Sequence, residues 1–181
     1  SLAPKDKIVA DLISGLGSLL KSRKVTVLDG HGRLHAGKRV TVSGGGSGDL
    51  EVTGDAVVLA PGSVPRTLPG FDVDGTIGMS SDEFLSISEL PKSAAIIGGG
   101  VIGCEFASLL ADLGTKVTIL EALPKILPGL DKDVTKVIEK SFKGRGIDIR
   151  TGAKVEGHSP TGSGTTVSAG GDAFDVGVVG V

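Results

Sequence analysis

The chain of 181 residues is expected to fold as an α/β protein in which short parallel strands alternate with helices. Three observations predict this class. Short apolar runs at 93–97 and 116–120 have the length and composition of buried strands. Between them, apolar residues recur at the three- and four-residue spacing of a buried helical face. A glycine-rich turn joins the first run to this helix, so the order predicts a parallel β-α-β unit.

The predicted helix and second strand follow from the residue pattern. The apolar face of the helix consists of Ile102, Phe106, Leu109, Leu110 and Leu113. Gly114 is expected to end it. The β-branched run K-V-T-I-L at 116–120 then brings Glu121 to the carboxyl end of the second strand.

The glycine turn has the spacing of a dinucleotide-binding motif. Its residues are Gly98, Gly99, Gly100, Val101, Ile102 and Gly103. The motif alone is weak evidence, because 30 glycines among 181 residues produce such spacings by chance. The strand before it, the helix after it and Glu121 together predict dinucleotide binding. The alternative is a glycine-rich turn that holds no ligand.

Each residue type in the motif has a physical task. Gly98 permits a tight turn, Gly100 lets the backbone approach a pyrophosphate, and Gly103 lets helix and strand pack closely. Free N–H groups at the start of the helix would meet the phosphates. Glu121 can accept hydrogen bonds from an adenosine ribose diol, which favours NAD over the 2′-phosphorylated cofactor.

Composition excludes several other classes of function. The net charge is −2 with both signs mixed along the chain, so neither a nucleic-acid partner nor a membrane surface is expected. The apolar runs are too short to span a bilayer and the start is too polar for a signal peptide, so we expect a cytoplasmic protein. One cysteine excludes an internal disulfide, a two-thiol redox centre or a zinc site within these residues.

The first part of the chain predicts a helix followed by strands. A helix is expected over 4–20, with a looser second half because of its two glycines. Strands are expected at 25–28 and as a meander over 33–53, and a fully buried strand at 55–59. A proline- and glycine-rich crossover covers 61–75. The run S-S-D-E at 80–83 predicts a capping box for a short helix.

The rest of the chain predicts one more β-α unit and a second meander. A helix is expected over 131–143 and a third parallel strand at 147–149. Strands at 153–158, 165–169 and from 174 onward repeat the layout of 33–62. This repeat predicts two related nucleotide-binding domains, of which the first is present only in its second half. Since the chain lacks an initiator methionine and stops in an apolar run, we expect an internal fragment.

Four segments resemble a known family, the flavoprotein pyridine nucleotide-disulfide oxidoreductases. They are 24–33 (K-V-T-V-L-D-G-H-G-R), 57–63 (V-V-L-A-P-G-S), 90–108 (with G-G-G-V-I-G-C-E-F-A-S) and 117–121 (V-T-I-L-E). The resemblance implies a three-layer ββα, Rossmann-like FAD/NAD(P)-binding fold. Residues 71–181 would form the NAD-binding domain, truncated at its C-terminal edge. Residues 1–70 would form the second half of an FAD-binding domain and the crossover.

The resemblance also implies positions that bind cofactors. Residues 98–103, Glu105 and Glu121 match the family's NAD contacts, and Val155 lies where its adenine wall comes. Gly32 and the turn ending in Gly62 and Ser63 match backbone contacts to FAD. Pro61 replaces the usual threonine, which puts a contact through that amide in doubt.

Two further positions keep open interpretations. Glu105 resembles the family's carboxylate near the nicotinamide, or it simply complements the helix dipole as a first-turn acid. Gly180 matches the glycine that begins the family's next cofactor loop.

Among the family's branches, the enzymes that oxidise dihydrolipoamide are the most similar. In them dithiol electrons pass through a disulfide to FAD, and the flavin gives a hydride to NAD. The resemblance implies a homodimer and a place in a 2-oxo acid dehydrogenase complex. The alternatives are a catalytically inert NAD-binding module and a sister reductase of the mercuric, glutathione or transhydrogenase type.

No catalytic residue of the family falls within these 181 residues. Cys104 stands alone and is expected to be buried packing rather than a nucleophile. We therefore expect that the chain by itself retains no FAD and oxidises no dihydrolipoamide.

Overall fold

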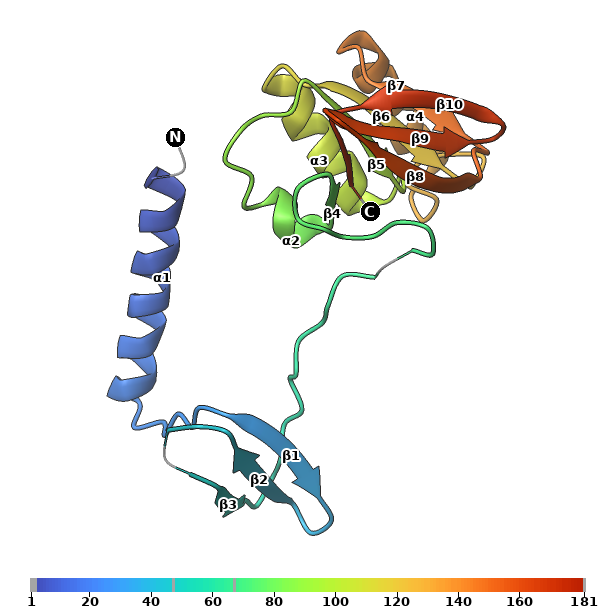
Figure 1. Ribbon diagram of the computed structural model, residues 1–181. Coiled ribbons are helices and arrows are strands. Elements are labelled where there is room, and N and C mark those ends of the chain that lie inside the picture. Colours follow the sequence, from blue (N-terminus) through green and yellow to red (C-terminus); the bar gives the residue numbers. More distant parts are fainter. Residues whose placement is uncertain (1–2, 47, 67, 181) are drawn as a thin grey trace. The chain divides into compact units, whose positions relative to one another are not determined.

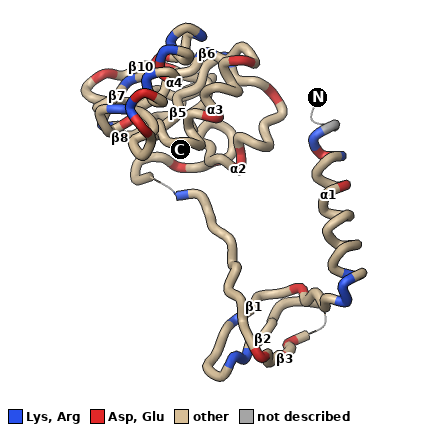
Figure 2. Tube along the Cα trace, turned by 180° about the vertical axis from the view of Figure 1, so that it is seen from behind, with Lys and Arg blue, Asp and Glu red and all other residues tan. Residues whose placement is uncertain are grey.

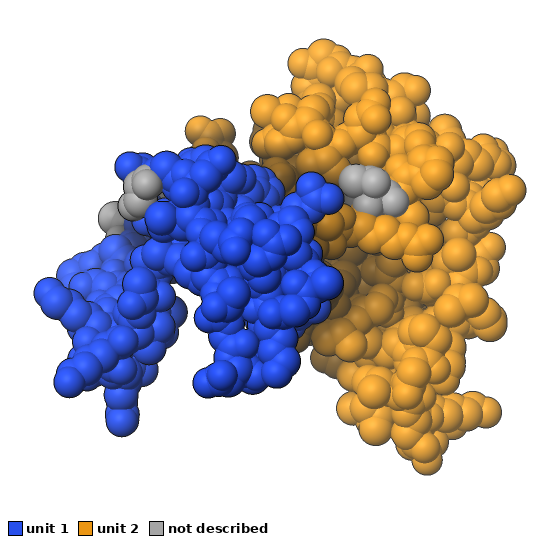
Figure 3. All heavy atoms as spheres, turned by 90° about the horizontal axis from the view of Figure 1, so that it is seen from below, with its two compact units in different colours: residues 1–63 blue, residues 64–181 orange. Residues whose placement is uncertain are grey.

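The computed structural model describes residues 3–46, 48–66 and 68–180 (Figure 1). The chain divides into two compact units, residues 1–63 and 64–181, which Figure 3 shows in blue and orange. The boundary expected from the sequence, after residue 70, lies later in the chain than this division. Residues 68–72 belong to the second unit because they pack on its antiparallel sheet. There Phe71 stacks on the His158 ring at 5.4 Å between centroids, and the N–H of His158 donates to the carbonyl of Gly70.

The first unit contains one helix and one small antiparallel sheet. The helix is α1 (Ala3–Ser22), which continues through both glycines. The sheet has the order β1-β2-β3, with β1 (His31–His35), β2 (Arg39–Ser43) and β3 (Leu50–Thr53). The turn between β1 and β2 uses positive φ at Gly37 and Lys38. The expected helix and meander are both confirmed.

Two expected strands of the first unit are wrong. Residues 25–28 and 55–59 carry β-branched apolar side chains, but neither segment forms a strand. A strand requires a neighbour for its N–H and C=O groups, and no described strand pairs with either segment. The expected burial is also wrong, since Val58 is 89% and Leu59 70% exposed.

The second unit is built on a parallel sheet of order β4-β11-β5-β6-β7. Its strands are β4 (Gly78–Met79), β5 (Ser93–Ile97), β6 (Lys116–Glu121), β7 (Asp148–Thr151) and β11 (Val178–Gly180). The strands expected at 93–97 and 116–120 are confirmed, and the third parallel strand begins one residue later than expected and ends two residues later. The short strand β4 escaped the sequence pattern because two residues carry no periodicity.

The second sheet of this unit is an antiparallel meander of order β10-β9-β8. Its strands are β8 (Val155–Thr161), β9 (Gly164–Ala169) and β10 (Asp172–Val176). The expected meander is confirmed, but its last apolar run leaves it. That run is β11, which pairs in parallel with β5 and β4.

Alternate residues of the parallel strands face two different layers. Ile96 and Ile119 belong to a buried cluster with the helices α3 (Val101–Asp112) and α4 (Lys132–Gly144). Ala95 and Leu120 belong to a second cluster with residues of β9 and β10. The unit is therefore the expected three-layer ββα sandwich, with the parallel sheet in the middle (Figure 1).

The helix ends follow the predicted signals. The short helix α2 (Ser81–Phe84) has a complete capping box, in which the Ser80 hydroxyl accepts from the N–H of Asp82 and the Glu83 carboxylate accepts from the N–H of Ser80. Gly114 ends α3 with φ of +98°. Arg145, just after α4, donates to the hydroxyl and carbonyl oxygens of Ser108 and so fastens the two helices together.

Figure 2 shows basic and acidic residues interspersed over the second unit. Its ion pairs include a local one, Arg150 with Asp148 at 2.8 Å, and one between residues distant in the sequence, Arg145 with Asp112 at 2.6 Å. Within the described part of the chain, no helix is long and apolar enough to cross a membrane.

Hydrogen exchange should separate the two units. Among the described hydrophobic residues of 1–63, only Val42 is buried, whereas β5 and β6 have a buried cluster on each face. We expect amides of β5 and β6 to exchange at least about tenfold more slowly than those of α1 and β1–β3. Mass-spectrometric exchange on the full chain checks this, and equal protection in both units would contradict it.

Cys104 belongs to the core cluster, as expected. It is 6% exposed, and its Sγ lies 3.5 Å from the carbonyl oxygen of Gly99. Burial, together with the charge of Glu121, raises the pKa of the Cys104 thiol to about 11. Because the folded pKa is raised, the neutral thiol stabilises the fold below its ordinary pKa near 9. That contribution is lost as pH rises through about 11.

The thiol should therefore be unreactive in the native chain. At pH 8 we expect Cys104 to react with a disulfide reagent at least about 100-fold more slowly than free cysteine, since little thiolate is present. Absorbance of the released thiolate measures the rate. The control is the urea-unfolded chain, in which the single thiol should react at the ordinary rate. Rapid native labelling would refute the buried assignment.

Candidate dinucleotide-binding site

The glycine turn lies at the carboxyl end of β5, directly before α3. Gly98 has φ of +107°, a conformation that only glycine adopts without strain. Its N–H donates to the carbonyl of Leu120 in the neighbouring strand at 2.9 Å. Gly100 is the N-cap of α3 with extended backbone. The task expected for Gly98, a tight turn, is confirmed.

Gly103 brings α3 into close contact with β5. A Cβ at this position would collide with the carbonyl oxygen of Gly98 and would lie 3.2 Å from Cγ2 of Ile96. No side chain fits without moving the helix away from the sheet. The expected packing task of Gly103 is thus confirmed.

Gly100 differs from both, because no other part of the protein requires glycine there. A Cβ would have no protein atom within 4 Å, and φ is −74°. The open side of Gly100 faces a mainly apolar cavity of about 430 Å³. Its lining includes Arg66, Phe84, Ile97, Val101, Ile102, Phe106 and Gly180. Space is therefore left at the position where the motif predicts the approach of a pyrophosphate.

The electrostatics of the turn favour an anion. The N–H of Cys104 makes the first bond of α3, to the carbonyl of Gly100. The N–H groups of residues 101–103 thus have no acceptor within the helix. The first turn of α3 carries no acidic residue, and Arg66 lines the same cavity. Free N–H groups and the helix dipole together suit a phosphate group.

Glu121 is connected to the glycine turn itself, which sequence reasoning did not foresee. Its side chain is buried at the end of β6. One carboxylate oxygen accepts from the N–H of Gly99 at 2.6 Å, and the other accepts from the N–H of Leu123 at 2.7 Å. Each oxygen keeps a second lone pair, so these bonds leave capacity for a ribose hydroxyl.

A second contact to the turn comes from the loop between β6 and α4. Leu127 has φ of +50°, and its N–H donates to the carbonyl of Gly99 at 2.7 Å. This left-handed conformation costs a non-glycine residue roughly 1–3 kcal/mol. A Cβ on Gly99 would lie 2.6 Å from Cγ2 of Ile126, which is fully buried. No motif in the sequence signals these contacts.

The other NAD positions expected from the resemblance lie around this turn. Val101 and Ile102 are exposed on the first turn of α3. Val155 is half-buried at the start of β8. Next to it along the chain, the N–H of Ala153 donates to the backbone carbonyl of Glu121. Gly180 lies in β11, where a Cβ would collide with the Phe84 ring.

Glu105 does not line the cavity at Gly100. It is exposed and lines a separate groove of about 530 Å³ between α3 and α4, with Cys104, Ser108 and Leu130 among its neighbours. It lies beyond the first turn of α3, so its expected role as a first-turn acid that complements the helix dipole is not supported.

The positions expected to contact FAD lie in the first unit. Gly32 is part of β1, paired with Val42 of β2. Gly62 has φ of +79°, so its turn requires glycine, and the neighbouring Ser63 is exposed.

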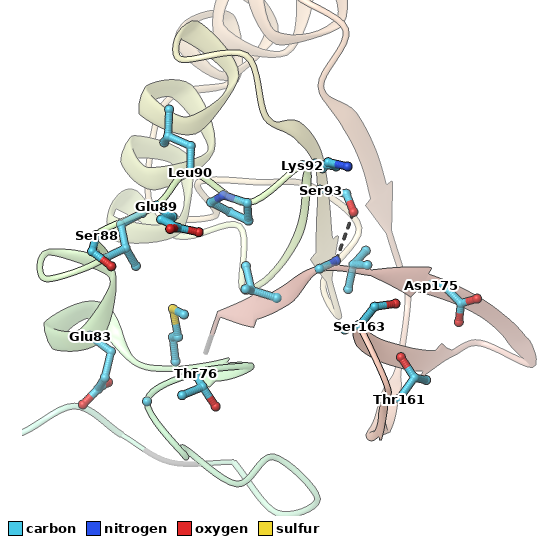
Figure 4. Close-up of a pocket in the computed structure, with 18 of the residues that line it drawn as sticks. Thr76, Glu83, Ser88, Glu89, Leu90, Lys92, Ser93, Thr161, Ser163 and Asp175 are labelled. Carbon is cyan, nitrogen blue, oxygen red and sulfur yellow. Dashed lines mark hydrogen bonds between the residues drawn. The ribbon is translucent and has the colours of Figure 1, made fainter. Parts of the chain in front are cut away.

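Another cavity of the second unit is at the opposite edge of its sheet. It measures about 830 Å³ and lies at the amino ends of β5 and β11. Hydroxyl and carboxylate side chains line it, and the Ser93 hydroxyl accepts from the N–H of Gly177 at 3.0 Å (Figure 4). Ligands of open α/β sheets bind at the carboxyl ends of the strands, which favours the glycine turn. Over the described residues, no cluster of histidine, cysteine and carboxylate side chains could hold a metal ion.

Comparison with known proteins identifies relatives of the whole chain. The family model for pyridine nucleotide-disulphide oxidoreductases matches residues 3–181. A dihydrolipoyl dehydrogenase of Bacillus subtilis is 42% identical over 160 residues, which are 83% of this chain and 34% of that protein. The leghemoglobin reductase of Glycine max is 33% identical over 94% of this chain and 34% of its own length. The chain thus spans about a third of the curated relatives it matches.

Comparison with solved structures also finds flavoprotein disulfide reductases. LpdA from Mycobacterium tuberculosis superposes with a TM-score of 0.89 at 26% identity, over 98% of this chain and 40% of that one. The flavoprotein disulfide reductase RclA from Escherichia coli gives 0.77 at 30% identity, over 99% and 41%. The fold, the glycine turn and these relatives together show that the chain belongs to the pyridine nucleotide-disulfide oxidoreductase family.

Proposed function

We propose that the second unit binds NAD and serves a flavoprotein that oxidises dihydrolipoamide. The observation that carries the proposal is the open side of Gly100, which faces an apolar cavity beside the free N–H groups of α3. A pyrophosphate fits there, with Glu121 at the end of the next strand toward the adenosine ribose. Several relatives at 36–42% identity are dihydrolipoyl or dihydrolipoamide dehydrogenases, which supports the choice of substrate.

In this proposal the residues of the chain bind and orient the nucleotide. The N–H groups of residues 101–103 hold the phosphates, while Ile102 and Phe106 exclude water from the apolar part of the cavity. In the complete enzyme, FAD supplies the hydride that NAD accepts. Gly32, Gly62 and Ser63 are the positions at which this chain would contact FAD.

Two points of the proposal rest on family resemblance alone: a homodimer and membership of a 2-oxo acid dehydrogenase complex. The choice of NAD rather than NADP rests on Glu121, and the proposed cytoplasmic location rests on composition. A sister disulfide reductase remains the alternative for the substrate, and the similarity to RclA favours it. The 181 residues alone contain one thiol, so by themselves they would bind NAD without oxidising a dithiol.

Titration with NADH and NADPH tests the cofactor. The chain has no tryptophan or tyrosine, so NADH fluorescence is read against a low background. We expect tighter binding of NADH, because the Glu121 carboxylate repels a 2′-phosphate. Glu121→Ala should narrow this preference by about 1–3 kcal/mol. It also releases the N–H of Gly99, so the ratio of the two affinities is the proper readout. Equal or tighter NADPH binding by the unmodified chain would refute the assignment.

Substitutions of Gly100 and Gly103 distinguish a glycine needed for ligand binding from a glycine needed for packing. Gly100→Val should leave the chain folded, because a Cβ there meets no protein atom, and should abolish NADH binding. Gly103→Ala should instead destabilise the second unit by about 1–3 kcal/mol, because its Cβ collides with the Gly98 carbonyl. Thermal unfolding and NADH titration measure the two effects. Unchanged NADH affinity in Gly100→Val would show that the glycine run is only structural.

A further inference from the structure

Gly99 is held on both sides by residues outside the glycine motif. Its N–H donates to the Glu121 carboxylate at 2.6 Å, and its carbonyl accepts from the N–H of Leu127 at 2.7 Å. The thiol of Cys104 approaches the same carbonyl at 3.5 Å. Its Cα packs so closely on Ile126 that an added Cβ would lie 2.6 Å from Cγ2. Both peptide groups of Gly99 are therefore fixed by residues outside the motif.

The loop that holds Gly99 adopts an unfavourable conformation to do so. Among the described residues other than glycine, positive φ occurs at Lys24, Lys38 and Leu127. The two lysines are exposed, whereas Leu127 is buried in the core cluster together with Ile126. A connection between β6 and α4 could place glycine at such a position, and Gly129 follows two residues later. A buried leucine in this conformation indicates a local constraint at the turn.

The residues that follow Gly99 in the sequence line the cavity at Gly100. Gly100 follows it directly, and the unpaired N–H groups of residues 101–103 come next. The hydrogen bonds on both sides of Gly99 limit the movement of these N–H groups when no ligand is bound. Ordering them in advance removes part of the entropy cost of binding a diphosphate.

We propose that Ile126 and Leu127 are positioning residues of the dinucleotide site, which hold Gly99 so that the start of α3 fits a diphosphate. This inference rests on the proposed NAD-binding function. It assigns a role in binding to the loop at 122–130, which contributes no residue to the lining of the cavity at Gly100. The positioning residues touch Gly99 and act through it.

Substitutions at Ile126 test the contact in the full chain, with NADH and ADP-ribose as probes because both carry the diphosphate. Ile126→Ala should weaken binding of both by about tenfold, since Gly99 loses its support. Ile126→Val keeps the Cγ2 that touches Gly99 and should bind within about twofold of the unmodified chain. The matched control is Ile147→Ala, which removes another buried isoleucine of the same cluster and should also bind within about twofold.

A double substitution distinguishes positioning from general loss of stability. Gly99→Ala pushes against Ile126 and should weaken NADH binding by about tenfold, whereas Gly99→Ala/Ile126→Ala makes room for the new Cβ. The double variant should therefore bind more tightly than Gly99→Ala alone, a rescue that mere destabilisation does not produce. Circular dichroism at the titration temperature confirms that each variant is folded. If Ile126→Ala does not fold, Gly99→Ala decides, and unchanged NADH affinity in it overturns the proposal.

The outcomes also separate this inference from the proposed function. If the unmodified chain binds neither NADH nor ADP-ribose, the NAD-binding proposal fails. Two results would refute the positioning role of the loop while NAD binding stands. In the first, Ile126→Ala binds NADH and ADP-ribose as tightly as the unmodified chain does. In the second, Ile126→Ala and Ile147→Ala lose affinity to the same extent.

Discussion

The close contact between Gly103 of α3 and the carbonyl of Gly98 is the constraint on which the second unit depends. It sets the start of the helix directly against the end of β5, at a separation that admits no side chain. The chain must reverse within very few residues to reach that position, which requires the positive φ of Gly98. The same contact directs the unpaired N–H groups of α3 toward the cavity at Gly100.

Buried charge at this site is balanced by backbone dipoles. Glu121 has a buried carboxylate, and the polar groups that meet it are the N–H groups of Gly99 and Leu123. Such hydrogen bonds compensate the loss of hydration. The carboxylate in turn helps to keep the Cys104 thiol neutral. No second negative charge therefore arises beside the turn, and the positive end of α3 stays available to an anion.

Membership of the family explains the architecture of the chain, but it does not identify the second substrate. RclA, which acts as a flavoprotein disulfide reductase, shares this fold over nearly the whole chain. A glycine turn and a terminal carboxylate specify a dinucleotide, and the second substrate of an enzyme is recognised elsewhere. The glycine turn at Gly98–Gly103 and Glu121 therefore support binding of a dinucleotide. They do not distinguish among dithiol substrates.

Local pattern was sufficient wherever a structure depends on neighbours in the sequence. The helix α3, the apolar runs of β5 and β6 and the capping box at Ser80 all appear as expected. The expected buried face of α3 is partly wrong, because Ile102, Leu109 and Leu113 are exposed. The residues of α3 that face the core are Cys104, Ala107 and Leu110. The tasks of Gly98 and Gly103 also followed from the motif, because steric limits on a turn depend on few residues.

Tertiary structure decided what depends on partners distant in the chain. Residues 25–28 and 55–59 have strand composition but form no strand, because composition does not provide a pairing neighbour. The run at 178–180 leaves its meander for the parallel sheet, where β4 and β5 satisfy its backbone. The bonds from Glu121 and Leu127 to Gly99 join residues 22 and 28 positions away, respectively. Such contacts follow from the packing of the loop over the turn, which no local pattern encodes.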